Sequence, residues 1–290
     1  MELVRSIRRG LKNRIKDFFK KTIFLFYKKK DDIFEFPLLT MEDRVVQNNP
    51  GENFVIPPAV YQTWVNREFG RSHALELEKF RSINKDLSFY IFDNDRLNDY
   101  MKIHWGDHDI YNIFINSKFA AMKADIFRYC ILYERGGYYF DINKGCSVPL
   151  RSLHMETDTA LLSFESNVTL VPPSINYIRN IALFNRLVLQ WGFGFEKKHP
   201  LLNIVIKNIC LYYQCFRGRS FDIPADAILM FTGPGMLTKS LIEYIDLRME
   251  LQCSFAGTDF NGKGYVMKGA HVRYRASPSY VNGRNSIIVA

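Results

Sequence analysis

Residues 124–143, ADIFRYCILYERGGYYFDIN, contain the features that decide the fold. Apolar side chains occupy most of the first twelve positions, which predicts a helix that is buried on nearly two faces. Gly136 and Gly137 supply the left-handed backbone with which many helices end. The aromatic run that follows predicts a short internal strand over Tyr138–Asn143. A buried helix followed by a buried strand indicates an α/β fold.

Two oxygen-bearing side chains, Asp141 and Asn143, end the predicted strand. Residues two apart on a strand point to one side, and the ligands of open α/β sheets gather beyond the carboxyl ends of the strands. The two side chains are therefore candidates to share a divalent cation that holds a diphosphate. The same Asp-x-Asn pattern is also common in turns, where both side chains bond their own backbone.

The predicted helix carries two charged residues, Asp125 and Arg128, among apolar neighbours. Residues three apart lie on one face of a helix, and unpaired charges are costly in an apolar environment. One interpretation is a structural ion pair. The other is a pair that binds a polar ligand through charge-assisted hydrogen bonds.

Three further motifs accompany this stretch: IPPAVYQTW at residues 56–64, HPLL at 199–202 and TGPGMLT at 232–238. In this order the four motifs resemble glycosyltransferase family 32, which includes yeast-type α-mannosyltransferases and bacterial capsule and lipopolysaccharide transferases. The resemblance covers roughly residues 54–280. It implies a GT-A fold, which is Rossmann-like, a nucleotide-sugar donor, a divalent cation (Mn²⁺ or Mg²⁺) and retention of the anomeric configuration.

The resemblance also implies roles for individual residues. Trp64 matches the tryptophan expected to stack on the donor's base, and Asp125 and Arg128 match the pair that contacts the donor sugar. Asp141 matches the first aspartate of the family's Asp-x-Asp motif. These residues are the predicted catalytic and donor-binding set, and no catalytic base is assigned.

Asn143 departs from the family pattern, because it stands where the second aspartate of the motif is usual. An asparagine carbonyl still ligates a hard cation, but it brings no negative charge, and Lys144 adds a positive one next to it. One hypothesis is a weaker metal site that operates when the donor diphosphate supplies further ligands. The other is that Lys144 takes over part of the metal's charge. The first hypothesis is favoured.

Two later segments are weaker candidates. The loop Thr232–Gly235 precedes a predicted helix, so the backbone amides at Gly233 and Gly235 are candidates to bind phosphate, although an ordinary turn explains the glycines as well. His271, followed by Ser279-Tyr280, is a loose equivalent of the histidine that completes the family's metal shell. His271 is therefore kept as a weak metal candidate.

Other polar residues are predicted to be structural. In the segment FDND, Asp95 is expected to cap a helix, so Asp93 and Asp95 are interpreted as structural. His199, before Pro200, is expected to start a helix or to pack rather than to bind a ligand. The five cysteines show no paired spacing and indicate reduced thiols: Cys130, Cys146, Cys210, Cys215 and Cys253.

The net charge of +9 is concentrated at the N-terminus. Residues 1–30 hold 11 of the 39 basic residues and 2 of the 30 acidic ones, so the rest of the chain carries 28 of each. Within residues 1–30 an apolar stripe recurs at three- and four-residue steps opposite a basic face. This pattern predicts an amphipathic helix that binds an anionic membrane surface. A helix packed on the catalytic domain and, less favoured, an RNA-binding helix are the alternatives.

The chain is predicted to form a basic amphipathic segment and tether over residues 1–53 and one GT-A catalytic domain over residues 54–290. The apolar run Thr22–Tyr27 is too short to span a bilayer, and no secretory signal is recognised. Strands are predicted at 59–64, 87–93, 138–143 and 160–165. Helices are predicted at 72–84, 95–104, 118–135, 199–216 and 235–244, which makes the later part more helical.

The predicted function is a retaining glycosyltransferase that moves a hexose-type sugar from a UDP- or GDP-sugar to a glycan or lipid-linked acceptor. Its expected setting is surface polysaccharide or lipopolysaccharide synthesis at the inner face of a bacterial cell membrane, with no nucleic-acid partner. Two alternatives stay open: a catalytically silent membrane-associated protein that binds a sugar nucleotide or glycan, and a nucleotidyltransferase.

Overall fold

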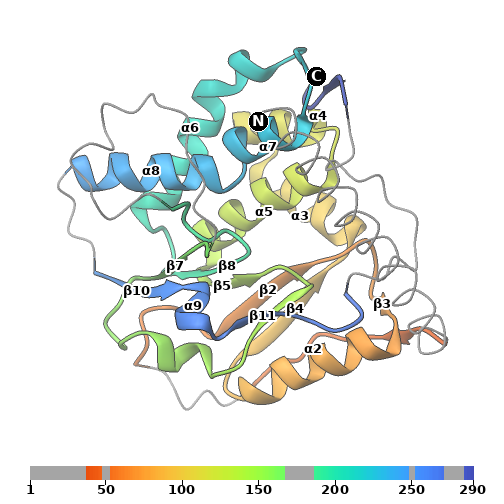
Figure 1. The fold of residues 1–290 in the computed structure, drawn as a ribbon, viewed down its shortest axis with the longest axis vertical. Helices are drawn as coiled ribbons and strands as arrows, with labels where there is room; N and C mark the ends of the chain where they lie inside the picture. Colours follow the sequence, from red (N-terminus) through yellow and green to blue (C-terminus); the bar gives the residue numbers. More distant parts are fainter. Residues whose placement is uncertain (1–36, 48–52, 167–185, 248–251, 271–283) are drawn as a thin grey trace, which may run out of the picture.

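A six-stranded sheet forms the centre of the computed structural model, which describes residues 37–47, 53–166, 186–247, 252–270 and 284–290 (Figure 1). Strand β8 is antiparallel to its two neighbours, and the other five strands run parallel to one another. The strands lie in the order β10 (Cys253–Thr258), β7 (Ala160–Phe164), β8 (Gly192–Phe195), β5 (Gly137–Phe140), β2 (Ala59–Thr63) and β4 (Ser88–Phe92).

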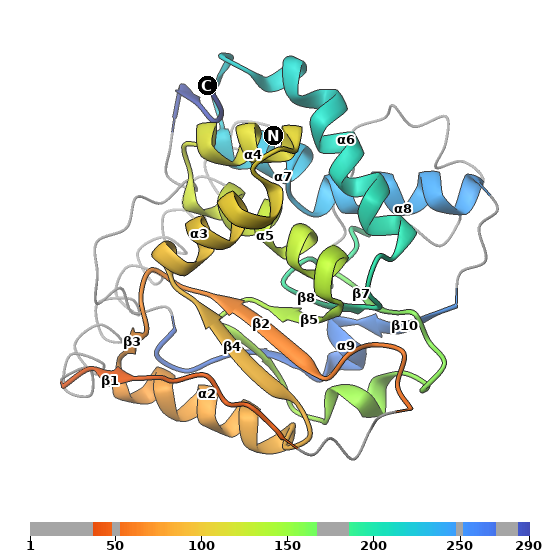
Figure 2. The ribbon, with the colours of Figure 1, turned by 180° about the vertical axis from the view of Figure 1, so that it is seen from behind.

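Helices cover both faces of this sheet (Figures 1 and 2). The larger core cluster lies beneath α3 (Asn94–Trp105), α4 (Asp109–Asn116), α5 (Ala120–Arg135), α6 (Pro200–Phe216), α7 (Pro224–Phe231) and α8 (Pro234–Asp246). The second cluster involves α2 (Arg71–Ile83), the 3₁₀ helix η1 (Leu150–Leu153) and the antiparallel pair β6 (Lys144–Cys146) and β11 (Gly264–Val266). The predicted α/β class is therefore confirmed.

Most predicted elements agree with the structure to within two residues. This holds for the strands predicted at 59–64, 87–93 and 160–165 and for all five predicted helices. The part of the chain from α6 to α8 is more helical, as predicted. Two short strands, β9 (Ser220–Phe221) and β12 (Ser286–Ile287), pair with each other outside the central sheet. The short element α9 (Asp259–Gly262) contains residues of left-handed backbone, so it is a turn rather than an ordinary helix.

The connection from α5 to β5 follows the predicted glycine stop. Gly136 has a φ of 67°, and its amide donates to the Leu132 carbonyl at 2.8 Å. Gly137 has a φ of 103°, a value that residues other than glycine seldom adopt. The strand itself ends at Phe140, so the prediction that it extends to Asn143 is wrong.

Strand β8 was not predicted, because its sequence, GFGF, has alternating glycines and glycine is depleted in strands. The structure gives the physical reason for the glycines. A Cβ atom at Gly194 would lie 2.6 Å from the Tyr138 ring, and one at Gly192 would lie 2.9 Å from the Phe140 ring. The aromatic side chains of β5 thus occupy the space that the glycines of β8 leave open.

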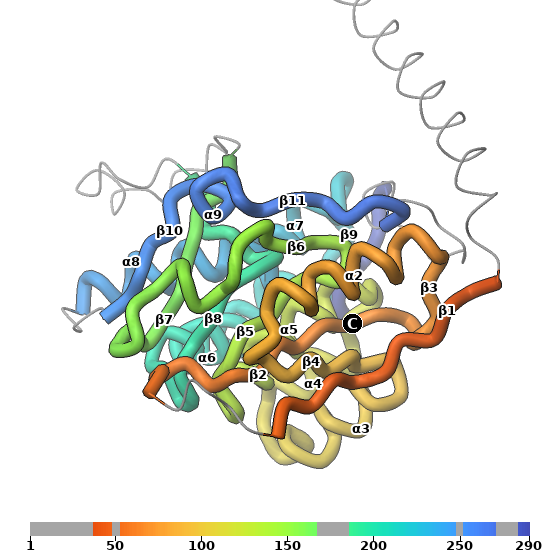
Figure 3. The backbone as a smooth tube through the Cα atoms, turned by 90° about the horizontal axis from the view of Figure 1, so that it is seen from below, coloured from red at the N-terminus to blue at the C-terminus, as the bar shows by residue number. Residues whose placement is uncertain are grey.

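Residues 37–47, called the strap below, pack along the outer strand β4 and beside α2 (Figure 3). Within the strap, β1 (Leu39–Thr40) pairs with β3 (Glu68–Phe69), and Arg44 forms an antiparallel bridge with Phe89 of β4. The Arg44 guanidinium donates to the carbonyls of Arg81, Asn84 and Leu87. The sequence placed these residues in a tether, but the described part of that segment belongs to the edge of the sheet.

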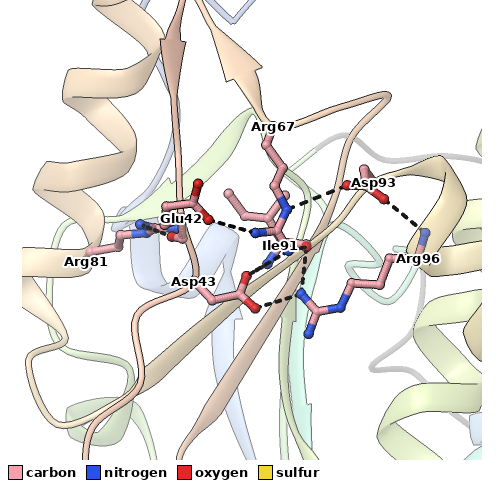
Figure 4. A network of polar contacts seen from close by, with 7 residues as sticks. All are labelled: Glu42, Asp43, Arg67, Arg81, Ile91, Asp93 and Arg96. Carbon is pink, nitrogen blue, oxygen red and sulfur yellow. Dashed lines mark hydrogen bonds and ion pairs between the residues drawn. The ribbon is translucent and has the colours of Figure 1, made fainter.

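Ion pairs attach the strap to the loop between β2 and β3 and to the start of α3, which follows β4 (Figure 4). Arg67 Nη1 lies 3.0 Å from Glu42 Oε2, and the Arg67 guanidinium also pairs with Asp43 and Asp93 at 3.5 and 3.6 Å. Arg96 Nη1 lies 2.7 Å from Asp43 Oδ2. Asp93 Oδ1 accepts from the Arg96 amide and caps α3, so Asp93 and not the predicted Asp95 is the N-cap.

The predicted basic helix of residues 1–30 lies outside the described residues. Among the residues that the structure describes, no helix combines the length and apolar character needed to cross a membrane.

Candidate active site

The carboxyl ends of β2, β4, β5, β7 and β10 meet at one edge of the sheet, because these strands are parallel. Trp64 follows β2, Asp141 follows β5, Glu165 follows β7 and Asp259 follows β10. The edge therefore brings together two of the residues predicted for the site and two further carboxylates. In open α/β sheets this edge is where ligands bind.

Asp141 and Asn143 lie in a tight turn, not on a strand. The Lys144 amide donates to the Asp141 carbonyl at 2.9 Å, which closes a four-residue turn between β5 and β6. The prediction that both residues lie on the strand, where alternation would relate their side chains, is therefore wrong. The alternative interpretation as a turn is correct for the backbone, but Asp141 Oδ1 accepts a hydrogen bond from Arg128 instead.

Contacts from three other parts of the chain hold the backbone of this turn. The Asp141 amide donates to the Trp191 carbonyl at 2.8 Å, just before β8. His73 Nε2 lies 2.8 Å from the Ile142 carbonyl, and the Met267 amide donates to the Asn143 carbonyl at 2.9 Å. The turn is consequently bonded to α2, to the start of β8 and to the segment after β11.

A buried arginine joins Asp141 to Asp125. Arg128 Nη2 lies 3.0 Å from Asp141 Oδ1 and 3.2 Å from Asp125 Oδ1. Its Nη1 donates to the Gln190 carbonyl at 2.9 Å, and its guanidinium lies 4.5 Å from the centroid of the Tyr139 ring. The predicted ion pair between Asp125 and Arg128 is thus present. Protein groups contact both terminal nitrogens of the Arg128 guanidinium, so Arg128 orients the two carboxylates. Its contact with a donor stays a prediction.

Burial sets the electrostatics of this cluster. Burial raises the pKa of Asp125 to about 7, although Arg128 and the Thr232 hydroxyl favour the ionised form. Burial lowers the pKa of Arg128, but Tyr139, Asp141 and Asp125 outweigh that effect, and the net shift is upward. Arg128 is therefore always charged, whereas Asp125 exchanges its proton near neutral pH.

The loop before α8 meets this cluster through Thr232. The Thr232 hydroxyl donates to Asp125 Oδ2 at 2.9 Å, and its carbonyl accepts from Tyr129 Oη at 3.1 Å and from Gln190 Nε2 at 2.9 Å. The Gly233 amide donates to the Ile228 carbonyl at 2.9 Å. That amide is not free for a phosphate, so the predicted role of Gly233 needs correction. The role of Gly235 stays a prediction.

Trp64 is half-buried at the carboxyl end of β2. Its amide donates to the Phe92 carbonyl at 3.1 Å, and its ring lies 6.4 Å from both the Phe69 and the His73 ring centroids. Burial lowers the pKa of His73, and the hydrogen bond to Ile142 opposes this shift. Trp64 and the Asp141 turn are consequently connected through one buried histidine.

Lys144 lies beside the turn with its ammonium 5.1 Å from the centroid of the Trp191 ring. It also influences the carboxylates at this edge. Burial and the Asp259 charge raise the pKa of Glu165, while Lys144 lowers it. Lys144 therefore carries positive charge at the site, as the second hypothesis for the departure at Asn143 requires.

Sequence analysis did not identify two buried polar residues that are functional candidates: His73 and Gln190. Each acts across a long separation in the chain, 69 residues to Ile142 and 61 residues to Tyr129. No local spacing signals such contacts. His199, predicted to start a helix, does so, since its Nδ1 accepts from the Leu201 amide at 3.1 Å. His271 lies outside the described residues.

The residues of the turn fit a cation that is shared with a phosphate ligand, not a closed protein cage. In the described parts of the chain no group of three histidine, cysteine, aspartate or glutamate side chains is arranged to hold a metal. Asp141 has a third of its side chain exposed, so its carboxylate reaches the surface of the edge. One carboxylate with water and phosphate oxygens is a usual environment for Mg²⁺.

Residues 70–160 match the family described as a glycosyltransferase sugar-binding region containing a DXD motif. An inositol phosphoceramide mannosyltransferase of Schizosaccharomyces pombe is 22% identical over 191 residues, which cover 64% of this chain and 45% of that protein. An uncharacterised glycosyltransferase of Acanthamoeba polyphaga mimivirus is 25% identical over 66% of both chains. A putative glycosyltransferase of Saccharomyces cerevisiae is 24% identical and covers 84% of this chain and 63% of that one.

Among solved structures, the PaToxG glycosyltransferase has a TM-score of 0.47 and 13% identity over 80% of this chain and 81% of that one. The chain spans about half to two thirds of the length of the curated relatives it matches. The sequence-family match and the named relatives support assignment of the chain to the glycosyltransferases of the family 32 type. They are consistent with a transferase enzyme.

Proposed function

We propose that this family 32-like glycosyltransferase is a retaining enzyme that moves a hexose-type sugar from a nucleotide-sugar donor to a glycan or lipid-linked acceptor. The observation that carries the proposal is the Asp141 turn at the carboxyl edge of the sheet, whose carboxylate is aligned by the buried Arg128. A purely structural ion pair would not need to place the partly exposed carboxylate of Asp141 at the edge where ligands bind.

Each side chain of the site is proposed to bind a different part of the donor. Trp64 offers a half-buried aromatic face for the base, and Asp125 offers a carboxylate for a sugar hydroxyl. Asp141 and Asn143 would hold the divalent cation together with the donor diphosphate. When bound, such a cation stabilises the negative charge that develops on the leaving diphosphate. Arg128 orients both carboxylates and adds positive charge behind them.

The relatives favour a first candidate for the donor. Several are named as mannosyltransferases, and three act, by their names, on inositol phosphoceramide, a lipid acceptor. A mannosyl nucleotide is accordingly the first donor to test. A lipid-linked acceptor agrees with the basic segment at the N-terminus, since membrane binding would bring enzyme and acceptor into one layer.

The test is a screen of UDP- and GDP-sugars for released nucleotide, with and without Mn²⁺, on the wild type and Asp141→Ala. Release of a nucleoside diphosphate from one donor, lost in Asp141→Ala, supports the proposal. Release of pyrophosphate from a nucleoside triphosphate and a sugar phosphate would favour a nucleotidyltransferase. Donor binding without release would favour a silent binding protein.

Residues 1–30 are proposed to attach the enzyme to the inner face of a bacterial cell membrane, in surface polysaccharide or lipopolysaccharide synthesis. Each basic residue near an anionic surface adds about 1 kcal/mol, so neutralising four should weaken binding to anionic vesicles roughly 1,000-fold. The variant carries R5Q, R8Q, R9Q and K12Q. A control neutralises four exposed lysines of the catalytic domain: K85Q, K102Q, K207Q and K239Q. Equal weakening by both variants would contradict a specific role of residues 1–30.

A further inference from the structure

His73 connects two parts of the donor site that are distant in the sequence. It lies in the first turn of α2 and is 1% exposed. Its Nε2 is 2.8 Å from the carbonyl of Ile142, the residue between Asp141 and Asn143. Because a carbonyl only accepts hydrogen bonds, Nε2 must carry the hydrogen. The imidazole is thus a donor aimed at the middle of the turn.

The same ring packs against the aromatic side chains that lead into α2. The Trp64 and His73 centroids are 6.4 Å apart at an interplanar angle of 81°, and the Phe69 and His73 centroids are 5.2 Å apart at 85°. These edge-to-face contacts fix the orientation of the ring. A shift of Trp64 would therefore move the donor that holds Ile142.

The hydrogen bond matters because Ile142 is itself buried, at 4% exposure. Its carbonyl would have no water to replace the histidine, and a buried acceptor without a partner is costly. The turn would relieve that cost by rotating the peptide between Ile142 and Asn143. Such a rotation would displace Asn143 relative to Asp141, while the sheet around them could stay in place.

We infer that His73 is a positioning residue, which holds the Asp141–Asn143 turn in the conformation that binds a divalent cation together with a nucleoside diphosphate. This inference rests on the proposed function. It adds that cation binding and the position of the base-stacking Trp64 are coupled through one side chain. Groups that orient a metal ligand commonly change metal affinity 10- to 100-fold when they are removed.

The test measures binding, not turnover. The full chain is titrated with MnCl₂ in the presence of UDP or GDP, and free Mn²⁺ is followed by its paramagnetic resonance signal. His73→Phe keeps an aromatic ring and removes the donor, and we expect the dissociation constant for Mn²⁺ to rise about tenfold or more. His73→Gln restores an N–H donor and should recover part of the affinity. His73→Met repeats the loss with a flexible side chain, so the result does not depend on how phenylalanine packs.

A matched control is His154, which is also a buried histidine. Its Nε2 lies 2.6 Å from Tyr138 Oη, and no contact of its imidazole reaches the turn among the described residues. His154→Phe should lower the melting temperature and leave the Mn²⁺ affinity unchanged. A merely structural role of His73 predicts the same behaviour for both variants.

The outcomes separate the inference from the proposed function. If the wild type binds no Mn²⁺ with either nucleotide, the proposed cation site fails. If the wild type binds Mn²⁺ and His73→Phe and His73→Met bind it equally well, the inference about His73 is overturned while the site stands. A selective loss in the two variants, with recovery in His73→Gln, confirms the inference.

Discussion

Two arginine–carboxylate networks lie near the same edge of the sheet, and their environments differ. Arg128 contacts Asp125 and Asp141 with 6% of its side chain exposed. Arg67 contacts Glu42, Asp43 and Asp93 with 25% of its side chain exposed (Figure 4). The ion-pair distances are similar, from 3.0 to 3.2 Å in the first network and from 3.0 to 3.6 Å in the second. The distances alone therefore do not reveal their roles.

Burial decides what each network contributes. A buried ion pair costs so much desolvation that an apolar pair of the same size is often as stable, so stability alone does not explain the network of Arg128. One of its carboxylates, Asp141, is partly exposed at the edge where a ligand would bind. The network of Arg67 is partly exposed, and ion pairs in contact with solvent contribute little to stability. It attaches the strap to the loop that follows Trp64. The desolvation free energy of its partly exposed charges is small.

The largest expected effect is the loss of Arg128. Replacing Arg128 with Leu leaves Asp125 buried beside Asp141 without its cation, and breaking a buried pair in this way destabilises a protein by about 3–5 kcal/mol. Urea denaturation of the variant and the wild type measures this difference. A loss below about 1 kcal/mol would show that the site is more hydrated than its burial indicates.

The second effect is a pH dependence of stability that arises from Asp125. Its pKa is about 7 in the folded protein, against a usual value of 3.8, so the folded state binds the proton more tightly. The resulting stabilisation is fully present below about pH 4 and is lost as the pH rises through about 7. At 1.36 kcal/mol per pKa unit, the loss reaches about 4 kcal/mol.

Asp125→Asn provides the comparison for this prediction, because the amide does not titrate. Between pH 4 and pH 8 the free energy of unfolding of the wild type should fall relative to that of Asp125→Asn. The measurement is chemical denaturation of both proteins across this range. Parallel curves would contradict the assigned proton exchange at Asp125.

A third prediction concerns the departure at position 143. Replacing Asn143 with Asp adds a negative charge to the turn, so we expect the Mn²⁺ concentration for half-maximal activity to fall by about tenfold, roughly 1.4 kcal/mol. Activity is followed at saturating donor over a range of Mn²⁺ concentrations. An unchanged midpoint would argue that position 143 is not a ligand and would strengthen the role of Lys144.

The smallest effect is expected at Arg67. Replacing Arg67 with Leu removes three partly exposed ion pairs, which should lower the free energy of unfolding by no more than about 1–2 kcal/mol. The loss should shrink further in 0.5 M salt, because salt screens exposed charges. A double-mutant cycle with Asp43→Asn isolates one of the pairs. A loss as large as that of Arg128→Leu would remove the contrast between the networks.

The sequence predicts the parts of this fold that depend on local patterns. The helix before Gly136 and the strands with uninterrupted apolar runs follow from periodicity and from the glycine stop. Strand β8 escaped prediction because its glycines make room for Tyr138 and Phe140, which lie more than fifty residues away in the chain. Local propensity contains no such information.

The candidate site also contains residues that the sequence predicts and residues that it does not. Asp125, Arg128 and Asp141 were predicted and meet in the structure. The turn at Asp141 was interpreted as a strand, because the aromatic run before it gives no signal of where pairing stops. His73 was not predicted, since its role depends on a contact between α2 and the turn that only the tertiary structure creates.

We propose that Asp141 serves the reaction beyond its ion pair with Arg128. The most direct measurement compares nucleoside diphosphate release and unfolding in Asp141→Asn and Asp158→Asn. Asp158 is a buried aspartate that accepts from the Met155 amide and the Ser254 hydroxyl, before β7 and away from the carboxyl edge. We predict that Asp141→Asn loses at least about 100-fold in release per folded molecule, as is typical when a group that stabilises charge is removed, and also loses some stability, because it removes one of the two carboxylates that contact the buried Arg128. Asp158→Asn should lose stability and keep its release per folded molecule. Undiminished release by Asp141→Asn would contradict a role of Asp141 in the reaction.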